Sequence, residues 1–328
     1  MSQNTTQLDR TAARSLTGFV QNMALHDWLV FGFFAYITLR AMAAPDGEGA
    51  DKARIFAGIL FISATVGILS VRAELLPRGL FRTLFYRVTV FAVLPTSYFL
   101  MGILLPALQQ PLMDERLLTI DLALFNTTPS VWFEQFNTRP VVEWFALFYY
   151  GYFAVMATMF LPMLFFGYGQ RLCELMLGAA IVAVLGHTGY TLVPGLGPYA
   201  VIDFHAPLNG GYFWGLVQSA VASAGAMLDI FPSLHTAYPT FFALHAFSNR
   251  ASGFCRYAWP ILAFVATNIV IATMFLRWHY GVDVIFGLLL AIIAWQVSTI
   301  TGRREWQRGQ DADDRQPVFD PVLPPIRR

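Results

Sequence analysis

Long apolar runs recur along the chain, and each is close to the length needed to cross a lipid bilayer. A helix spans the hydrocarbon core with roughly 20 consecutive apolar residues. The pattern therefore predicts an all-α fold, a polytopic membrane helix bundle. We expect about eight spans, at residues 25–44, 55–71, 85–108, 142–166, 175–193, 233–247, 259–276 and 280–300.

The composition is that of an integral membrane protein. Of 328 residues, 56% are hydrophobic and 12% are charged, whereas a soluble domain carries about 25% charged residues. The net charge of +1 gives no indication of a nucleic-acid partner. No early apolar run ends in a clear cleavage site, so we expect no removable signal peptide. Cys173 and Cys255 fall at predicted cytoplasmic helix ends, where a disulfide is not expected.

Arginine is concentrated in alternate connecting segments, and this determines the expected orientation. The positive-inside rule places arginine-rich segments in the cytoplasm. Both termini are then cytoplasmic, and the spans 233–247 and 280–300 begin at the outer, periplasmic face. The predicted cytoplasmic segments carry Arg10 and Arg14; Arg72, Arg78, Arg82 and Arg87; Arg171; Arg250 and Arg256; and Arg303, Arg304, Arg308, Arg315, Arg327 and Arg328.

Two long segments lie on the predicted outer side. In the first, residues 113–125 place apolar residues at helical spacing among charges, which is typical of an interfacial helix or of a solvated loop. The second, residues 194–230, has no lysine or arginine and could be a lid, a wall for lipid access or a plain connector. We expect Asp229 in this segment, and His26 near the first span, to be solvent-exposed.

A histidine and an aspartate stand at the head of the last span. Residues 277–283 read Arg-Trp-His-Tyr-Gly-Val-Asp. His279 and Asp283 are four residues apart and share one helix face. The carboxylate can fix the imidazole tautomer and leave the other ring nitrogen free as a nucleophile. A purely structural His–Asp pair is the alternative.

A second histidine motif opens the sixth span. Residues 231–237 read Phe-Pro-Ser-Leu-His-Thr-Ala. Pro232 suits the first turn of a helix, and the free backbone N–H groups around Ser233 can bind an anion. His235 beside that anion could act as a general acid, or it could be a capped structural residue. Because ionisable residues are costly in lipid, two such motifs at one membrane face indicate phosphoryl transfer.

The two motifs resemble those of the type 2 phosphatidic acid phosphatase superfamily. Residues 232–235 match its Pro-Ser-x-His motif and residues 279–283 match its His-x-x-x-Asp motif. The form Pro-Ser-Leu-His-Thr, together with residues 114–125 and 148–152, is similar to the branch that contains fungal inositol phosphorylceramide synthase. The resemblance covers roughly residues 85–300.

The resemblance implies a division of the chain and a set of roles. Residues 1–84 would be an N-terminal tail with two additional transmembrane helices, 85–300 a six-helix phosphatase core, and 301–328 a charged cytoplasmic tail. His279 would attack phosphorus and form a phosphohistidine, Asp283 would orient it, and His235 would protonate the departing alkoxide. Ser233 would hold phosphate oxygens. The family needs no metal and no cofactor.

The chain departs from the family at the residues that bind phosphate. No Lys-x6-Arg-Pro motif stands at the outer end of the third core helix. Arg277 is the nearest cation that could grip phosphate, although it could also anchor the helix at lipid headgroups. Tyr190 and Tyr199 could donate hydrogen bonds, but tyrosines are common at membrane interfaces.

We therefore expect an outward-facing, metal-independent lipid phosphatase or phosphotransferase. Its substrate would be a membrane lipid phosphate or phosphodiester, and its acceptor water or an alcohol such as inositol. One alternative is a lipid or polyprenyl phosphate transporter that uses His and Asp as a proton relay. Another is a zinc enzyme, which the predicted pairing of Asp283 with His279 disfavours.

Overall fold

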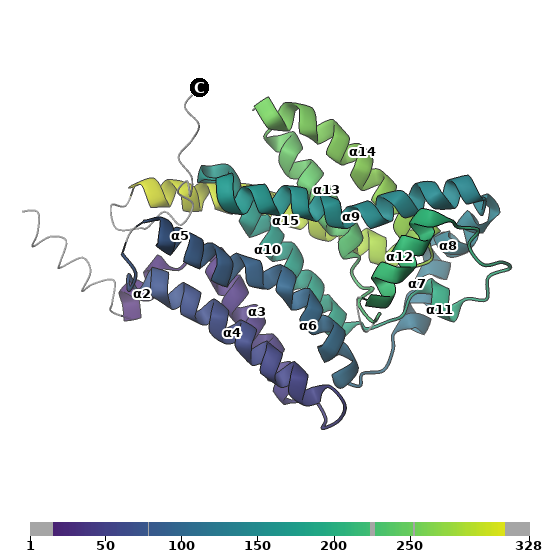
Figure 1. Cartoon of the computed structure of the whole chain (residues 1–328), viewed down its shortest axis with the longest axis horizontal. Coiled ribbons are helices and arrows are strands. Elements are labelled where there is room, and N and C mark those ends of the chain that lie inside the picture. The colour runs from purple at the N-terminus through teal and green to yellow at the C-terminus, as the bar shows by residue number, and fades with distance from the viewer. Residues whose placement is uncertain (1–15, 78, 224–226, 252, 312–328) are drawn as a thin grey trace, which may run out of the picture.

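The protein is described by a computed structural model that covers residues 16–77, 79–223, 227–251 and 253–311 (Figure 1). Helices make up 80% of it, and the described residues contain no strand beyond a single bridge between Gly195 and Asp229. The predicted all-α fold is confirmed. The helices are α2 Leu16–Asn22, α3 Leu25–Met42, α4 Ala50–Arg72, α5 Leu80–Tyr86, η1 Arg87–Ala92, α6 Val93–Ala107, α7 Asp114–Phe125, α8 Pro129–Trp132, η2 Phe133–Phe136, α9 Arg139–Phe166, α10 Gly169–Leu192, α11 Pro198–Val201, α12 Tyr212–Ser223, α13 Leu234–Ser248, α14 Gly253–Phe275 and α15 Gly281–Asp311.

Six helical stretches within the described residues are long and apolar enough to cross a membrane, which confirms a polytopic bundle. The other two predicted spans form α3, with 18 residues, and α13, with 15 residues. At about 1.5 Å per residue α13 is shorter than a bilayer core of about 30 Å. It nevertheless packs among α9, α10, α14 and α15 inside the bundle. The six stretches that are long and apolar enough to cross a membrane are Ala50–Arg72, Leu80–Ala107, Arg139–Phe166, Gly169–Leu192, Gly253–Phe275 and Gly281–Gln307.

The predicted domain boundaries fall within helices. One helical stretch runs from Leu80 to Ala107, so the boundary at residue 84 lies inside it. Similarly, α15 continues past residue 300 to Asp311. The rest of the predicted cytoplasmic tail, from residue 312, lies outside the described residues.

Three glycines on α10 let α13 approach closely. A Cβ atom added at Gly178 would overlap the Phe241 ring, and one added at Gly186 or Gly189 would overlap Leu234 or Pro232. Because lipid tails are as apolar as leucine, membrane helices associate through close packing at small residues. The stretch Gly169–Leu192 is accordingly the most buried of the six, since 83% of its most apolar 18-residue segment lies inside the protein.

The two N-terminal helices are joined to the bundle by a buried polar network. Asp27 accepts hydrogen bonds from Arg72 Nε at 2.7 Å and from the Tyr86 hydroxyl. The Tyr86 hydroxyl also lies 2.8 Å from His26 Nε2. His26 is fully buried, so its predicted exposure was wrong. The network links α3, α4 and α5.

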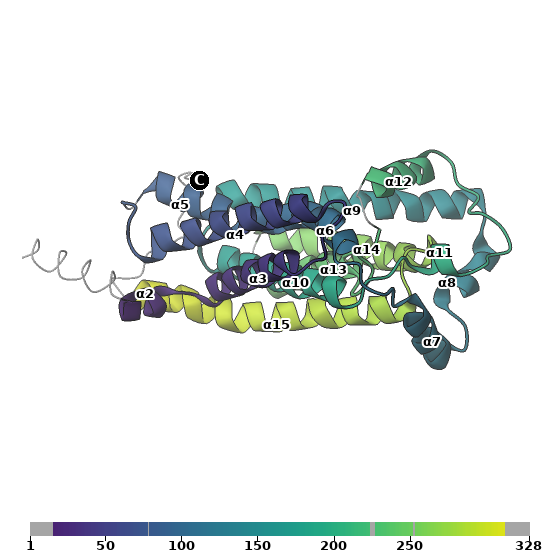
Figure 2. The ribbon, with the colours of Figure 1, turned by 90° about the horizontal axis from the view of Figure 1, so that it is seen from below.

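The long helices bring both histidine motifs to the same end of the bundle. The beginnings of α13 and α15 lie near α7, α8, α11 and α12, which cluster at one end (Figures 1 and 2). The other end holds α2 and the last turns of α15 (Figure 2). A single end therefore carries the short helices, the connecting segments and the two motifs.

Substitution Asp27→Ala is expected to destabilise the protein by about 3 kcal/mol, because it leaves the buried Arg72 guanidinium without its charge partner. Thermal unfolding in detergent measures this. Asp51→Ala is the matched control, because Asp51 is 89% exposed in its pair with Arg54 and such pairs contribute little. Equal unfolding temperatures for the two variants would contradict the role given to Asp27.

Candidate active site

The turn between α14 and α15 positions His279. The N–H groups of Trp278 and His279 donate to the Thr273 carbonyl at 3.0 and 3.1 Å. The N–H of Tyr280 donates to Asp283 Oδ2 at 2.9 Å, so this carboxylate caps the start of α15. The five residues between the helices therefore form a fixed turn.

His279 and Asp283 face each other across this turn, as the spacing predicted. His279 Nδ1 lies 3.5 Å from Asp283 Oδ2, and both side chains are buried. This distance is long for a hydrogen bond. Neither His279 Nδ1 nor Asp283 Oδ1 has a hydrogen-bond partner among the described residues. A small closing movement would pair the two, as catalytic hydrogen bonds often tighten only when substrate binds.

Two carboxylates of α7 hold the segments around His279. Asp121 accepts hydrogen bonds from the N–H groups of Gly281 and Val282, both at 2.8 Å. Asp114 accepts the Gly197 N–H at 2.8 Å and the Tyr280 hydroxyl at 3.1 Å. The predicted helix at residues 113–125 is therefore present, and its buried face binds the turn that carries His279.

His235 stands in the first turn of α13. Ser233 is the N-cap of this helix, and its hydroxyl accepts the Thr236 N–H at 3.3 Å. The Ser233 N–H donates to the backbone carbonyl of Asp283 at 3.1 Å. This bond ties the two histidine motifs together through their backbones. The His235 ring packs against Tyr149 and Tyr152 of α9 and lies near His279.

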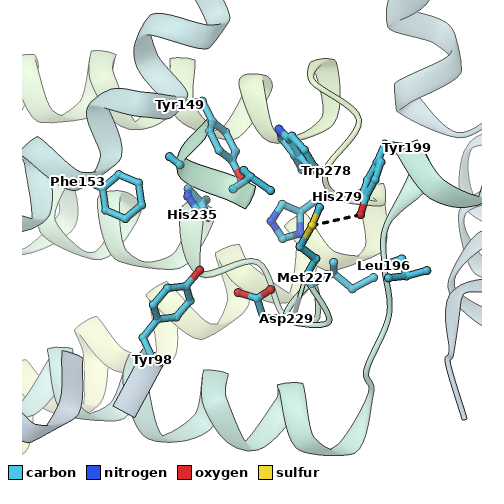
Figure 3. A pocket seen from close by; sticks show the side chains of 13 residues that line it. Tyr98, Tyr149, Phe153, Leu196, Tyr199, Met227, Asp229, His235, Trp278 and His279 are labelled. Atoms are coloured by element: carbon cyan, nitrogen blue, oxygen red, sulfur yellow. Dashed lines mark hydrogen bonds between the residues drawn. The ribbon is translucent and has the colours of Figure 1, made fainter. Parts of the chain in front are cut away.

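The two imidazoles meet at one small cavity. The ring centroids of His235 and His279 are 6.2 Å apart, and both rings line a cavity of about 60 Å³ (Figure 3). His235 is held between Tyr149, with centroids 4.4 Å apart, and Tyr152, at 4.1 Å. Within the described chain, His235 Nε2 is buried without a hydrogen-bond partner. The cavity has room for a group the size of several water molecules.

The predicted phosphate-binding residues divide into two groups. Tyr199 lines the cavity, with its hydroxyl 3.8 Å from Met227 Sδ (Figure 3). Tyr190 is buried in α10 and Ser233 is buried at its capping position, and neither lines the cavity. Arg277 lines an adjoining cavity of about 320 Å³.

Arg277 is already engaged in that adjoining cavity. Its Nη2 donates to Glu134 Oε1 at 3.3 Å, and its guanidinium lies 3.8 Å from the centre of the Phe204 ring. Tyr199, Val221, Met227 and Trp278 line both cavities. Arg277 thus lines the adjoining cavity and is not among the residues that line the cavity between the imidazoles.

Comparison with known protein families identifies the family to which the chain belongs. The sequence model of the PAP2 superfamily matches residues 115–297, which is more than half of the chain. The chain belongs to the PAP2 superfamily. Searches of curated proteins and of solved structures found no match. Membership and the apolar helix bundle together identify an integral membrane enzyme of the phosphatase or phosphotransferase type.

The cavity of this PAP2 superfamily member also contains residues that the sequence motifs did not reveal. Asp229 was predicted to be solvated, but it is partly buried and lines the cavity, and burial raises the pKa of its carboxyl group. Its position three residues before Pro232 could have signalled this. Tyr98 belongs to α6, which lies outside the residues matched by the family model. No local sequence pattern identifies it as a cavity residue. Tyr149 and Trp278 complete the aromatic wall.

The described residues contain no group of three His, Cys, Asp or Glu side chains arranged to hold a metal ion. The predicted zinc alternative needs two histidines and one aspartate as ligands to the same ion. In this site Asp283 Oδ2 lies 3.5 Å from His279 Nδ1, so the carboxylate is placed to pair with that imidazole. The geometry therefore provides no support for the zinc alternative.

Substitution Asp121→Ala is expected to lower turnover by about 100-fold, because small displacements of a catalytic group are costly and the turn at Gly281 loses its anchor. Turnover of lipid phosphates by purified protein measures this. Glu115→Ala on the exposed face of the same helix is the control. An Asp121→Ala enzyme with the control's rate would show that the anchor is dispensable.

Proposed function

We propose that this protein is a metal-independent lipid phosphatase or phosphotransferase that works through a phosphohistidine. The observation that supports this most directly is the pair of imidazoles with centroids 6.2 Å apart at one cavity. Asp283 stands behind one ring, and two tyrosines hold the other. This is the arrangement that a nucleophile and a general acid on opposite sides of one phosphoryl group require.

In the first step His279 attacks phosphorus through Nε2, the atom not directed at Asp283. The new N–P bond forms as the P–O bond to the lipid breaks, and the electron pair of that bond stays with the departing oxygen. His235 gives this oxygen a proton. Asp283 stabilises the positive charge that develops on the His279 ring.

In the second step a hydroxyl oxygen attacks the phosphohistidine. The O–P bond forms, the N–P bond breaks, and the electron pair returns to His279 Nε2. The proton of the hydroxyl passes to His235, which is then ready for another cycle. With water as acceptor the protein is a phosphatase, and with an alcohol such as inositol it is a transferase.

The charge of the cavity favours a phosphodiester as donor. Among the described lining residues there is no lysine or arginine, and Asp229 is a carboxylate. A phosphodiester carries one negative charge, whereas a phosphomonoester carries up to two and needs more compensation. We propose that Tyr199 donates a hydrogen bond to the phosphoryl group and that Arg277 attracts its negative charge from the adjoining cavity. A diester donor agrees with a function similar to that of inositol phosphorylceramide synthase.

We propose that the site faces the periplasm and that both termini are cytoplasmic. The excess of arginine in the connecting segments at the other end of the bundle supports this orientation, because the positive-inside rule places arginine-rich segments in the cytoplasm. A donor lipid would then reach the cavity sideways from the outer leaflet. The clustering of the cavity's ionisable groups at one end favours an enzyme over a transporter with a proton relay across the bilayer.

Substitutions His279→Ala and His235→Ala are each expected to abolish turnover, because one removes the nucleophile and the other the general acid. The assay offers purified protein a panel of lipid phosphates and phosphodiesters, with and without inositol, and identifies products by mass. His205→Ala, with its side chain 91% exposed, is the control. Wild-type turnover in either cavity variant would contradict the role given to that histidine.

Substitution Asp283→Asn is expected to lower turnover by roughly 10³- to 10⁴-fold, because an amide stabilises the charged imidazole poorly and can favour the wrong tautomer. Rate constants and unfolding temperature are measured on the same preparation. A rate within a few-fold of wild type would reduce Asp283 to its capping role at Tyr280.

A further inference from the structure

Asp229 is held firmly in the segment that leads into α13. Asp229 forms a parallel β-bridge with Gly195, and the Gly195 N–H donates to the Leu228 carbonyl at 3.3 Å. The next residue along from Gly195, Leu196, donates its N–H to Asp114 at 3.0 Å. The position of the Asp229 carboxylate is therefore set by the same α7 anchor that holds the turn at His279.

The Asp229 carboxylate faces the space between the two histidines. Figure 3 shows it beneath the His235 and His279 rings, on the side opposite Tyr149 and Trp278. The Tyr98 hydroxyl points toward it (Figure 3), and its interaction with the carboxylate partly offsets the rise in the pKa of Asp229 that burial causes. The carboxylate is close enough to His279 for the two groups to interact electrostatically. Asp229 is thus a third ionisable group at the reaction space.

A carboxylate at this place is unfavourable for phosphate by itself. It is the single acidic side chain among the described residues that line the cavity, and none of those residues is a lysine or an arginine. Facing phosphoryl oxygens directly, it would repel them. The repulsion disappears if a group that donates a hydrogen bond to the carboxylate stands between it and phosphorus. Burial, which raises the pKa of Asp229, makes the carboxylate a stronger acceptor for such a donor.

We propose that Asp229 binds the hydroxyl group of the phosphoryl acceptor and directs its oxygen at phosphorus, with Tyr98 as the positioning residue that fixes the carboxylate. The inference rests on the proposed function, because it concerns the second step of that reaction. The acceptor is a hydroxyl compound, either water or an alcohol. Asp229 accepts the hydrogen bond of the hydroxyl while the oxygen approaches.

The step balances without a further reactant. The acceptor oxygen forms a bond to phosphorus as the bond from phosphorus to His279 Nε2 breaks, and the electron pair of that bond returns to the imidazole. The acceptor proton leaves the hydrogen bond to Asp229 and passes to His235, the base of this step. Asp229 is therefore dispensable for donor cleavage and needed for transfer.

The test separates the two steps in wild type, Asp229→Asn, Tyr98→Phe and Asp203→Asn. Purified full-length proteins in detergent are mixed with radiolabelled phosphatidic acid or phosphatidylinositol and quenched in alkali, which preserves phosphohistidine. Diacylglycerol release reports the first step, and loss of enzyme-bound label reports the second. Asp203→Asn is the matched control, because Asp203 is exposed in the same connecting segment.

The expected result is a specific defect in transfer. The Asp229→Asn enzyme should release a first equivalent of diacylglycerol as fast as wild type. It should then keep the label bound, because breakdown of its phosphohistidine is slowed by about 100-fold. Tyr98→Phe should slow breakdown by about tenfold, and Asp203→Asn should match wild type. Running breakdown with and without added inositol, and identifying products by mass, distinguishes water from an alcohol as the acceptor.

Three results would overturn the inference. Equal slowing of both steps in Asp229→Asn would indicate a general structural role. An unchanged breakdown rate in both Asp229→Asn and Tyr98→Phe would show that Asp229 takes no part in transfer. Slowed release of diacylglycerol with normal breakdown would assign Asp229 to the donor instead. Enzyme that is never labelled, wild type included, contradicts the proposed phosphohistidine itself, so that failure is distinguishable from the others.

Discussion

The end of the bundle that carries the two histidine motifs depends on carboxylates that accept hydrogen bonds from backbone N–H groups of distant segments. Asp121 binds the start of α15, and Asp114 binds the loop at Gly197. In the same way, Glu143 of α9 accepts hydrogen bonds from the N–H groups of Gly211, Phe213 and Trp214 and so holds the start of α12. Charge-assisted hydrogen bonds of this kind are about twice as strong as neutral ones. They hold irregular segments in place where no ladder of backbone bonds does so.

This anchoring explains how a membrane bundle can hold a small site accurately. Helices that associate in lipid are positioned by packing, as the α10 glycines and α13 illustrate. Packing sets the distance between helix axes but leaves connecting segments free to vary. The Ser233 N–H that binds the Asp283 carbonyl, and the α7 carboxylates, remove that freedom. As a result, the two histidines have a fixed separation.

The sequence allowed most of the fold and the proximity of the two histidine motifs to be predicted, for identifiable reasons. Apolar runs of bilayer length have one stable outcome, and His279 and Asp283 are local partners on one helix. The remaining site residues could not be found in this way. Asp121 lies 160 residues from the Gly281 N–H that it binds, and Tyr98 reaches the cavity from a helix with no polar signature. Such contacts are determined by the packing of whole helices, which no local pattern encodes.

The small volume between the imidazoles has a kinetic consequence. About 60 Å³ accommodates one phosphoryl-sized group, and an adjoining cavity of about 320 Å³ shares Tyr199, Met227 and Trp278 with it. A released alcohol and an incoming one would therefore have to occupy the same place in turn. Under the proposed phosphohistidine mechanism, this favours a double-displacement scheme, in which each substrate in excess competes with the other. In that mechanism the size of the cavity would set the order in which molecules enter and leave.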